Sequence, residues 1–352
     1  MATDQLAPET ARRISPLEIS NWDALVTSRP DFSFFHGAAW ARVLTETYGF
    51  TPFYLATGPA DVPESMLVLM EVDSWLTGRR GVSLPFTDEC APLAANQAEN
   101  EKLFQSALKI GRERVWKYIE CRGGRKLFGE VPAALSFYGH RLQLEANEEK
   151  MFGRLESSVR RAIRKSQKDG VTVEISQALD AVRIFYRLQC ATRKRHGLPP
   201  QPFEFFVNIH RHILSQNQGM VAVARHHGQA VAAAVYFFLG GRAIYKYGAS
   251  DLARQELRAN NSVMWEAIRW LAQRGATQLH FGKTARANDG LRRFKLAWGT
   301  TEETLEYVKY DLRKSRFVTD TDAVSGWHNA VFRTLPECLS RTAGNLLYKH
   351  WA

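Results

Sequence analysis

The sequence predicts a mixed α/β protein with two domains in tandem, each a mixed, mainly antiparallel sheet flanked by helices, followed by a C-terminal helical tail. Three observations predict this class. The 352 residues are enough for two hydrophobic cores. The second half reads as a meander of strands followed by strand, loop, helix and strand. The first half repeats that outline in a looser form.

The composition is that of a globular protein, with 45% apolar and 24% charged residues. The formal net charge of +11 favours anionic partners, such as tRNA, phosphorylated lipid carriers, nucleotide sugars, acyl-CoA or an anionic membrane face. The four cysteines form no CxxC pair, so we expect neither a metal site nor a disulfide framework. The polar N-terminus does not resemble a signal peptide, and we expect a cytoplasmic location.

Residues 1–15 are expected to be a flexible tail, and residues 16–145 to be the first domain. Its predicted helices span 21–28, a segment ending at Gly49, and 99–111. Its predicted strands are 53–56, 66–72, 81–86, 116–120 and 138–144. His36 lies among aromatic residues, so we interpret it as a packed or capping residue.

The second domain is expected over residues 146–313, beginning with a basic helix at 147–168. An apolar stripe with helical spacing predicts the buried side of this helix: Met151, Leu155, Val159 and Ile163. Its cationic side has two interpretations, a solvated face or a phosphate-binding face that includes Arg161 and Arg164. The rest of the domain is predicted to consist of helices 178–196 and 203–216 and strands 171–175, 220–225, 230–239 and 304–311.

The stretch that organises the chain runs from strand 243–247 to Gly299. A polar loop at 250–260 leads into a helix starting at Asn261 or Ser262, both good N-caps, and Gly275 suits its left-handed C-cap. Strand 279–281 follows. Two loops therefore leave neighbouring strand ends beside one helix N-terminus, which is where ligands and anions collect in α/β sheets. We place the active site here.

Residues 314–352 are predicted to form a basic amphipathic tail, because large apolar residues alternate with cations. One hypothesis is a helix lying on the anionic inner face of the membrane. The other is a helix packed on the body of the protein.

The segments NNSVMWEAIRWLAQRGATQLHFGKT and DGLRRFKLAWG together resemble the C-terminal signature of FemAB-type aminoacyltransferases, a branch of the GNAT acyltransferases. SLPFTDECAPL resembles the segment that borders the acceptor cleft in that family. The resemblance implies two GNAT-like domains, with the acceptor side in the first. It also implies transfer of an acyl or aminoacyl group to an amine of a peptidoglycan or polysaccharide precursor.

The resemblance places Phe294 and Lys295 beside the reacting carbonyl. A fixed ammonium there stabilises the tetrahedral oxyanion of aminolysis by roughly a few kcal/mol. Tyr247 and Asp289 are further catalytic candidates in the same stretch, although neither is assigned as the general base. His280 is expected to face the opposite side of the sheet. The residues expected to bind substrate are Arg161, Arg164, Trp40, Phe86, Asn260, Asn261, Lys283 and Thr284.

The donor stays open between aminoacyl-tRNA and acyl-CoA, with no other cofactor expected. The loop that binds acyl-CoA in GNAT enzymes is glycine-rich, whereas Leu257 replaces its first glycine here, which weakens a pyrophosphate nest. No helical-hairpin insertion of the kind used as a tRNA arm is recognised either. Two alternatives remain: an acyl-CoA-dependent N-acetyltransferase of a small amine or sugar, and a non-enzymatic module that binds RNA or lipid.

Overall fold

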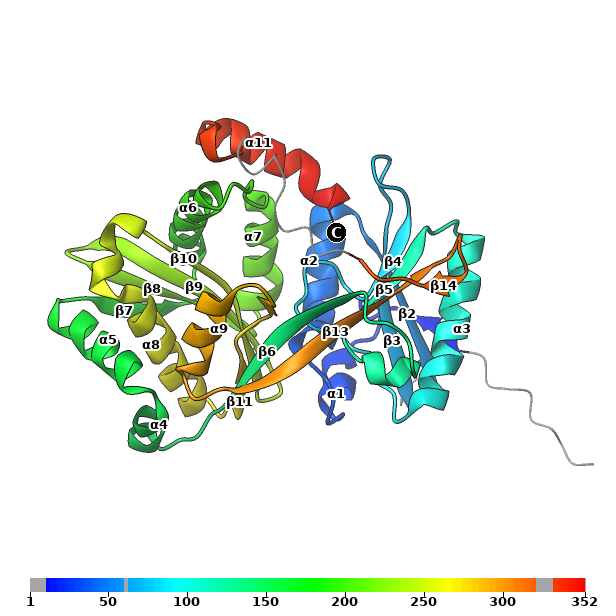
Figure 1. The fold of residues 1–352 in the computed structure, drawn as a ribbon, viewed down its shortest axis with the longest axis horizontal. Helices are drawn as coiled ribbons and strands as arrows, with labels where there is room; N and C mark the ends of the chain where they lie inside the picture. Colours follow the sequence, from blue (N-terminus) through cyan, green and yellow to red (C-terminus); the bar gives the residue numbers. More distant parts are fainter. Residues whose placement is uncertain (1–10, 60–62, 321–331, 352) are drawn as a thin grey trace, which may run out of the picture. The chain divides into compact units, whose positions relative to one another are not determined.

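The computed structural model describes residues 11–59, 63–320 and 332–351. The chain forms two compact units. The first comprises Met1–Ser136, Leu305–Asp322 and Lys349–Ala352, and the second comprises Phe137–Thr304 and Ala323–Tyr348. Figure 1 shows helices packed on a sheet in each unit. The predicted class of two tandem α/β domains is therefore confirmed. The part of the predicted N-terminal tail before residue 11 lies outside the described residues.

The first unit has a sheet with strand order β1-β2-β3-β4-β5-β13. Its neighbouring strands are antiparallel except β4 and β5, which are parallel and are connected through helix α3. Helices α1 and α2 precede β2 in the chain. The bounds are β1 Arg12–Ile14, α1 Trp22–Thr27, α2 Ala38–Tyr48, β2 Thr51–Thr57, β3 Ser65–Val72, β4 Arg80–Val82, α3 Gln97–Glu113, β5 Tyr118–Arg122, β13 Thr301–Asp311 and β14 Arg316–Phe317.

The second unit has a sheet with strand order β6-β11-β10-β9-β8-β7, and β12 also pairs with β6. Its one parallel step joins β10 to β11 through helix α8. The strands are β6 Leu135–Gln143, β7 Thr172–Ser176, β8 Gly219–His226, β9 Gln229–Leu239, β10 Arg242–Ser250, β11 Gln278–His280 and β12 Thr284–Ala285. The helices are α4 Glu148–Arg154, α5 Ser157–Lys168, α6 Leu179–Arg195, α7 Phe203–Ile209, α8 Ala259–Gln273, α9 Asp289–Leu296 and α11 Glu337–Leu347.

The two sheets repeat one pattern: an antiparallel meander, one parallel step across a helix, and a last antiparallel strand. Each last strand comes from elsewhere in the chain. β6 precedes the other strands of the second unit yet pairs with β11, whereas β13 follows them and pairs with β5 of the first unit. The units therefore end near residues 136 and 305, whereas the sequence suggested bounds at 145 and 313.

Three predicted elements need correction. Residues 147–168 form two helices, because Leu155 and Glu156 adopt extended backbone and the Glu156 N–H donates to Ala297 O at 3.0 Å. The strand predicted at 81–86 ends at Val82, since Leu84 and Phe86 take positive φ angles of 50° and 62°. Residues 12–14, expected to be part of a flexible tail, pair with β2.

Helix α8 also begins earlier than predicted. Its N-cap is Arg258, in the left-handed region at φ 54°, rather than Asn261 or Ser262. The predicted left-handed glycine at its other end is present, with Gly275 at φ 81°. His36 is buried and completes a capping box with Ser33, as interpreted from the sequence.

The C-terminal segment contains helix α11, which packs on α6. Tyr348 follows this helix, is buried, and donates from its hydroxyl to Pro199 O at 3.2 Å. This favours the packed helix for that part of the predicted tail, while residues 321–331 of it lie outside the described residues. Among the described helices, none has both the length and the apolar character needed to cross a bilayer.

Candidate active site

Strand β10 carries a β-bulge beside the loop that leads to α8. Tyr245 pairs with Tyr236 and Tyr247 pairs with Val235, so Lys246 is the extra residue. A bulge interrupts the ladder and redirects the side chains on either side of it. Tyr245 and Tyr247, two residues apart, would share one face of a regular strand, but the bulge separates them.

The two tyrosines consequently have different surroundings. Tyr245 lies against Tyr236 with ring centroids 5.4 Å apart and lines a cavity beside α8. Burial raises the pKa of Tyr245 to about 12, so its hydroxyl keeps its proton at neutral pH. Tyr247 instead lies among rings of α6 and α7, with Phe206 at 5.7 Å. Sequence reasoning selected Tyr247 and missed Tyr245, because a bulge cannot be seen in the strand's composition.

We call the space next to Tyr245 the β10–α8 cavity; its volume is about 390 Å³. Polar and cationic residues of the loop and the first turn of α8 line one side: Ser250, Asp251, Arg254, Gln255, Arg258, Asn260 and Asn261. Phe294 and Leu291 line it from α9. Asn260 and Asn261, selected from the sequence, thus meet Phe294 at one cavity. Cations at a helix N-terminus suit a phosphate-bearing ligand.

A second hollow, the α5–α9 groove, has a volume of about 680 Å³ and shares Arg258, Asn261 and Phe294 with that cavity. Its cationic lining comes from three helices or their ends: Arg161, Lys165, Arg258 and Arg293. Glu156 is the acidic residue of the lining. Arg164 does not line it and instead lies over the Phe152 ring at 5.4 Å. The groove therefore includes Arg161 of the two arginines selected from the sequence.

Lys295 is buried, with 3% of its surface exposed, on helix α9. Its Nζ donates to Gly282 O at 2.8 Å and to Lys283 O at 3.2 Å. A buried ammonium must be hydrogen-bonded to offset its loss of hydration, and these carbonyls do so. The side chain therefore points to the end of β11 and not into solvent.

The other residues selected from this stretch are more dispersed. The Lys283 ammonium lies 4.3 Å from the centre of the Phe137 ring. Asp289 is exposed in the first turn of α9 and lines neither hollow. Phe294 is half-buried next to Trp298, with ring centroids 6.2 Å apart.

Two buried polar side chains lie on the face of the sheet that Lys295 reaches. His140 of β6 is fully buried, and its Nε2 is 3.2 Å from Glu302 Oε2. Burial and the charge of Lys295 lower the pKa of His140, while Glu302 opposes them. Thr284 is opposite Tyr138, two residues from His140, and its buried hydroxyl has no hydrogen-bond partner among the described residues. Sequence analysis did not select His140.

His280 has a different setting. It is opposite Arg141, so the two side chains share a face, whereas its neighbour Leu279 is in the core. Its Nε2 is 3.7 Å from Glu303, which also binds Arg141. Glu302, which contacts His140, and Glu303, which contacts His280, thus lie on opposite faces of the sheet. His280 therefore does not face Lys295.

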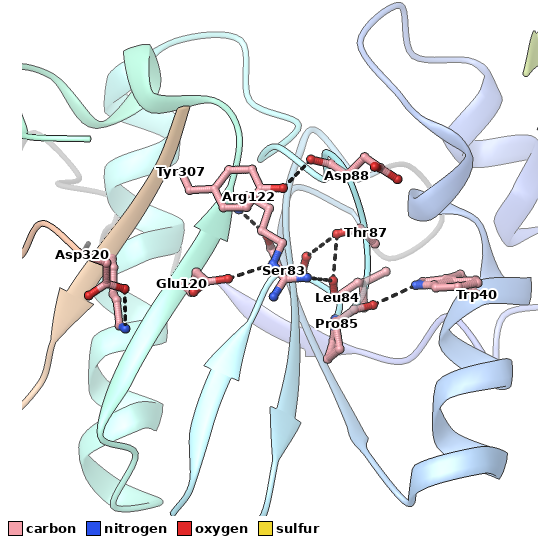
Figure 2. A network of polar contacts seen from close by, with 11 residues as sticks. Trp40, Ser83, Leu84, Pro85, Thr87, Asp88, Glu120, Arg122, Tyr307 and Asp320 are labelled. Atoms are coloured by element: carbon pink, nitrogen blue, oxygen red, sulfur yellow. Dashed lines mark hydrogen bonds and ion pairs between the residues drawn. The ribbon is translucent and has the colours of Figure 1, made fainter. Parts of the chain in front are cut away.

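The loop after β4 in the first unit is held by a network of polar contacts, shown in Figure 2. Trp40 donates from its indole to Pro85 O at 3.2 Å, and Tyr307 donates to Asp88 O at 2.6 Å. Trp40 is fully buried, so it holds this loop from the interior of the first unit. The Arg122 backbone N–H donates to Ser83 Oγ at 2.6 Å.

This network holds two residues in a rarely populated backbone conformation. Leu84 and Phe86 both have positive φ, which is costly for side chains of this kind. Phe86 is half-buried, with its ring 5.4 Å from that of Tyr48. Such strain persists only where the surroundings impose it, and it is concentrated at ligand sites. The loop is therefore the best candidate for a binding surface in the first unit.

Comparison with known proteins agrees with these features. Residues 153–296 match the family described as Acetyltransferase (GNAT) domain. These residues contain the bulged strand, the β10–α8 cavity and Lys295. No curated protein matches the chain by sequence.

Solved structures similar to the chain include that of FemX, with a TM-score of 0.66 and 16% identity over 84% of this chain and 96% of that one. L-PGS from Bacillus licheniformis has a TM-score of 0.52 and 10% identity, covering 85% and 93%. A tandem GNAT protein from the clavulanic acid biosynthesis pathway has a TM-score of 0.53 and 8% identity, covering 86% and 98%. At these identities the likeness establishes the fold.

The chain thus carries a GNAT domain and is an acyltransferase. Its fold over most of its length is that of FemX and of tandem GNAT proteins, which confirms the resemblance found in the sequence. The hypothesis of a non-enzymatic binding module is not retained.

Gly248 provides a test of the geometry around Tyr245. A Cβ built at Gly248 would lie 1.7 Å from the Tyr245 hydroxyl oxygen. We expect Gly248→Ala to lower the free energy of unfolding by about 1–3 kcal/mol, the usual cost of overpacking. Adding Tyr245→Phe should recover part of that loss, measured by urea unfolding of the two single variants and the double variant. Strictly additive effects would contradict this contact.

Proposed function

We propose that the protein transfers an acyl or aminoacyl group to an amine of a cell-envelope precursor, either of peptidoglycan or of a polysaccharide. The observation that carries the proposal is the fixed ammonium of Lys295 at the end of β11; Lys295 lines neither hollow, but Phe294, the residue before it on α9, lines the β10–α8 cavity. The resemblance to FemAB-type enzymes implies a reacting carbonyl at this lysine, and the similarity of the fold to that of FemX supports a transferase of this kind.

In this proposal the amine attacks the carbonyl of an activated ester or thioester. The carbonyl oxygen becomes negative, and Lys295 lowers the energy of that charge because its position is fixed before the reaction. Phe294 excludes water and shapes the site. Collapse of the tetrahedral intermediate restores the carbonyl and breaks its bond to the donor.

The donor is proposed to bind in the β10–α8 cavity with a phosphate near Arg254, Arg258 and the first turn of α8. Aminoacyl-tRNA and acyl-CoA both offer an activated carbonyl attached to phosphates. Leu257 is buried where a glycine would open the loop, and Arg258 takes the left-handed conformation instead. That geometry supports a phosphate site built from side chains more than from a glycine-rich backbone nest.

The α5–α9 groove is proposed to hold a second anionic part of a substrate. Arg161, Lys165 and Arg293 bring three cations to it beyond Arg258. A phosphate-bearing envelope precursor, or the backbone of a tRNA, has the complementary charge. The strained loop around Phe86 is the proposed acceptor surface of the first unit.

Replacing Lys295 tests the mechanism. We expect Lys295→Met to lower the rate of transfer by about 10²–10³-fold, since one oxyanion contact is lost. The measurement is mass spectrometry of envelope precursors from cells that lack the protein, contain it, or contain the variant. Lys309→Met is the matched control, because Lys309 is paired with Asp320 at 2.7 Å in the first unit. A normal mass increment with a folded Lys295→Met protein would disprove this role.

The donor can be identified by thermal unfolding in the presence of two probes. A ligand of the folded state raises the melting temperature in a saturable manner. A rise with acetyl-CoA indicates an acyl thioester donor, and a rise only with an aminoacylated tRNA acceptor stem indicates an aminoacyl ester. Either rise should shrink in Arg258→Ala and persist in Lys168→Ala, an exposed change on α5. No rise with either probe would contradict the proposed cavity.

Contact with an anionic membrane is also proposed, through a surface of the first unit. Trp75 is 84% exposed and Leu76 is 51% exposed in the loop between β3 and β4. The Trp75 ring lies 5.4 Å from that of His350, next to the exposed Trp351. Exposed tryptophans with cations beside them, here Lys349, suit the interface of an anionic bilayer.

Sedimentation with vesicles tests this surface. We expect binding to phosphatidylglycerol vesicles, weaker binding to phosphatidylcholine vesicles, and a loss with added salt. A double variant, Trp75→Ala with Leu76→Ser, should bind several-fold less, whereas Leu252→Ser changes an exposed apolar residue of the second unit and should bind normally. Equal binding by both variants would remove the membrane proposal.

A further inference from the structure

The proposed reaction releases a proton from the attacking amine, and the sequence offered no convincing group to accept it. The geometry points to His140, oriented by Glu302, as the group that takes up this proton and returns it to the leaving group of the donor. This inference rests on the proposed transfer to an amine. It adds a residue from β6, far in sequence from the stretch that contains Lys295.

The contact with Glu302 determines which ring nitrogen is the base. Glu302 is an acceptor only, so we assign the hydrogen to Nε2, which lies 3.2 Å from Glu302 Oε2 although this contact lacks the geometry of a hydrogen bond. Nδ1 then has the free lone pair. Like Nε2, it is buried and makes no hydrogen bond among the described residues. A buried polar atom without a hydrogen bond is uncommon in folded proteins and calls for an explanation, which a role in proton transfer would supply.

Three charged or titratable groups act on His140 from the elements around it: Lys295 of α9, Glu302 of β13 and His280 of β11. Burial and Lys295 keep the ring neutral, which is the state that a base requires. Arg292 of α9 binds both oxygens of Glu302, at 2.7 and 2.8 Å, and lowers the pKa of its carboxyl. Glu302 therefore remains ionised and keeps its orienting role.

The same charges link proton uptake to the reaction. In the resting site the positive charge of Lys295 disfavours a second cation on His140. When the amine attacks, the new C–N bond forms and the carbonyl electron pair moves to oxygen, beside Lys295. That negative oxygen offsets the ammonium, so the basicity of His140 rises at the step in which the nitrogen must lose its proton.

Thr284 supplies a connection between the buried ring and the reacting nitrogen. It is opposite Tyr138 in the pairing of β12 with β6, which makes it a diagonal neighbour of His140 on one face. In this structure the hydroxyl and His140 Nδ1 are not hydrogen-bonded to each other. Once that bond forms, the hydroxyl can accept the amine's proton while donating its own to Nδ1, so that atoms and charge balance. When the intermediate collapses, the reverse transfer protonates the departing oxygen or sulfur.

Nuclear magnetic resonance of the full chain, with ¹⁵N-labelled histidine, tests the electrostatic part. The His140 signals are identified by their loss in His140→Gln. We expect the His140 titration midpoint to shift to lower pH in Glu302→Gln, because the carboxylate favours the charged ring. It should shift to higher pH in Lys295→Met, because an opposing cation is removed. A midpoint that moves in neither variant would overturn the inference.

Mass spectrometry of envelope precursors tests the catalytic part. We expect His140→Gln to lower the rate of formation of the mass increment by about 10²–10⁴-fold, the usual contribution of a general base. Thr284→Val should also lower it, while Thr284→Ser should restore it. Val223→Ala, in a buried position of β8 outside both hollows, controls for lost stability and should keep the increment.

The outcomes separate the two proposals. A normal increment from a folded His140→Gln protein overturns the role of His140 and leaves the proposed transfer intact. Absence of the increment with the wild-type chain contradicts the transfer itself, whatever the titrations show. If His140→Gln does not fold, Glu302→Gln replaces it, since that variant keeps the histidine but removes the group that orients it; a normal increment there is equally decisive against the inference.

Discussion

The buried ammonium of Lys295 is the interaction on which the rest of the site depends. Its hydrogen bonds to Gly282 O and Lys283 O attach α9 to the end of β11. That attachment brings Phe294 to the β10–α8 cavity. A cation in this position is stable only while those carbonyls replace its lost water. The same groups that hold the helix therefore also fix a positive charge where a negative oxygen is proposed to form.

Much of this arrangement could be predicted from the sequence. The parts that could not be predicted share one cause, which is that no local sequence pattern reveals them. The meander, the helix after β10 and the residues around Phe294 and Lys295 are local patterns along the chain. The bulge at Lys246 leaves no trace in composition, so the separation of Tyr245 from Tyr247 stayed hidden. His140 reaches the site only through the pairing of β6 with β11, which no local pattern reveals.

The same non-local pairing explains why the predicted domain bounds differ from the compact units. A strand at the end of a sheet carries no local mark of the strand it pairs with. β6 therefore reads as the last strand of the first half, and β13 as the last strand of the second. Each in fact completes the other sheet, β6 through β11 and β13 through β5. Glu302 lies on β13, which follows the other strands of the second unit in the sequence. It nevertheless contacts His140 of β6.

The positive charge of the chain also becomes informative once it is located. A net charge of +11 spread evenly would explain little beyond solubility. In the second unit, however, Arg161, Lys165 and Arg293 gather at one groove that adjoins the cavity lined by Phe294. Cations concentrated beside this cavity attract substrates that carry phosphate, and Arg254 and Arg258 add two more cations to the lining of the cavity itself. Cations beside the proposed site would hold a charged carrier, while the reaction proposed at Lys295 takes place where the ammonium is shielded from bulk water.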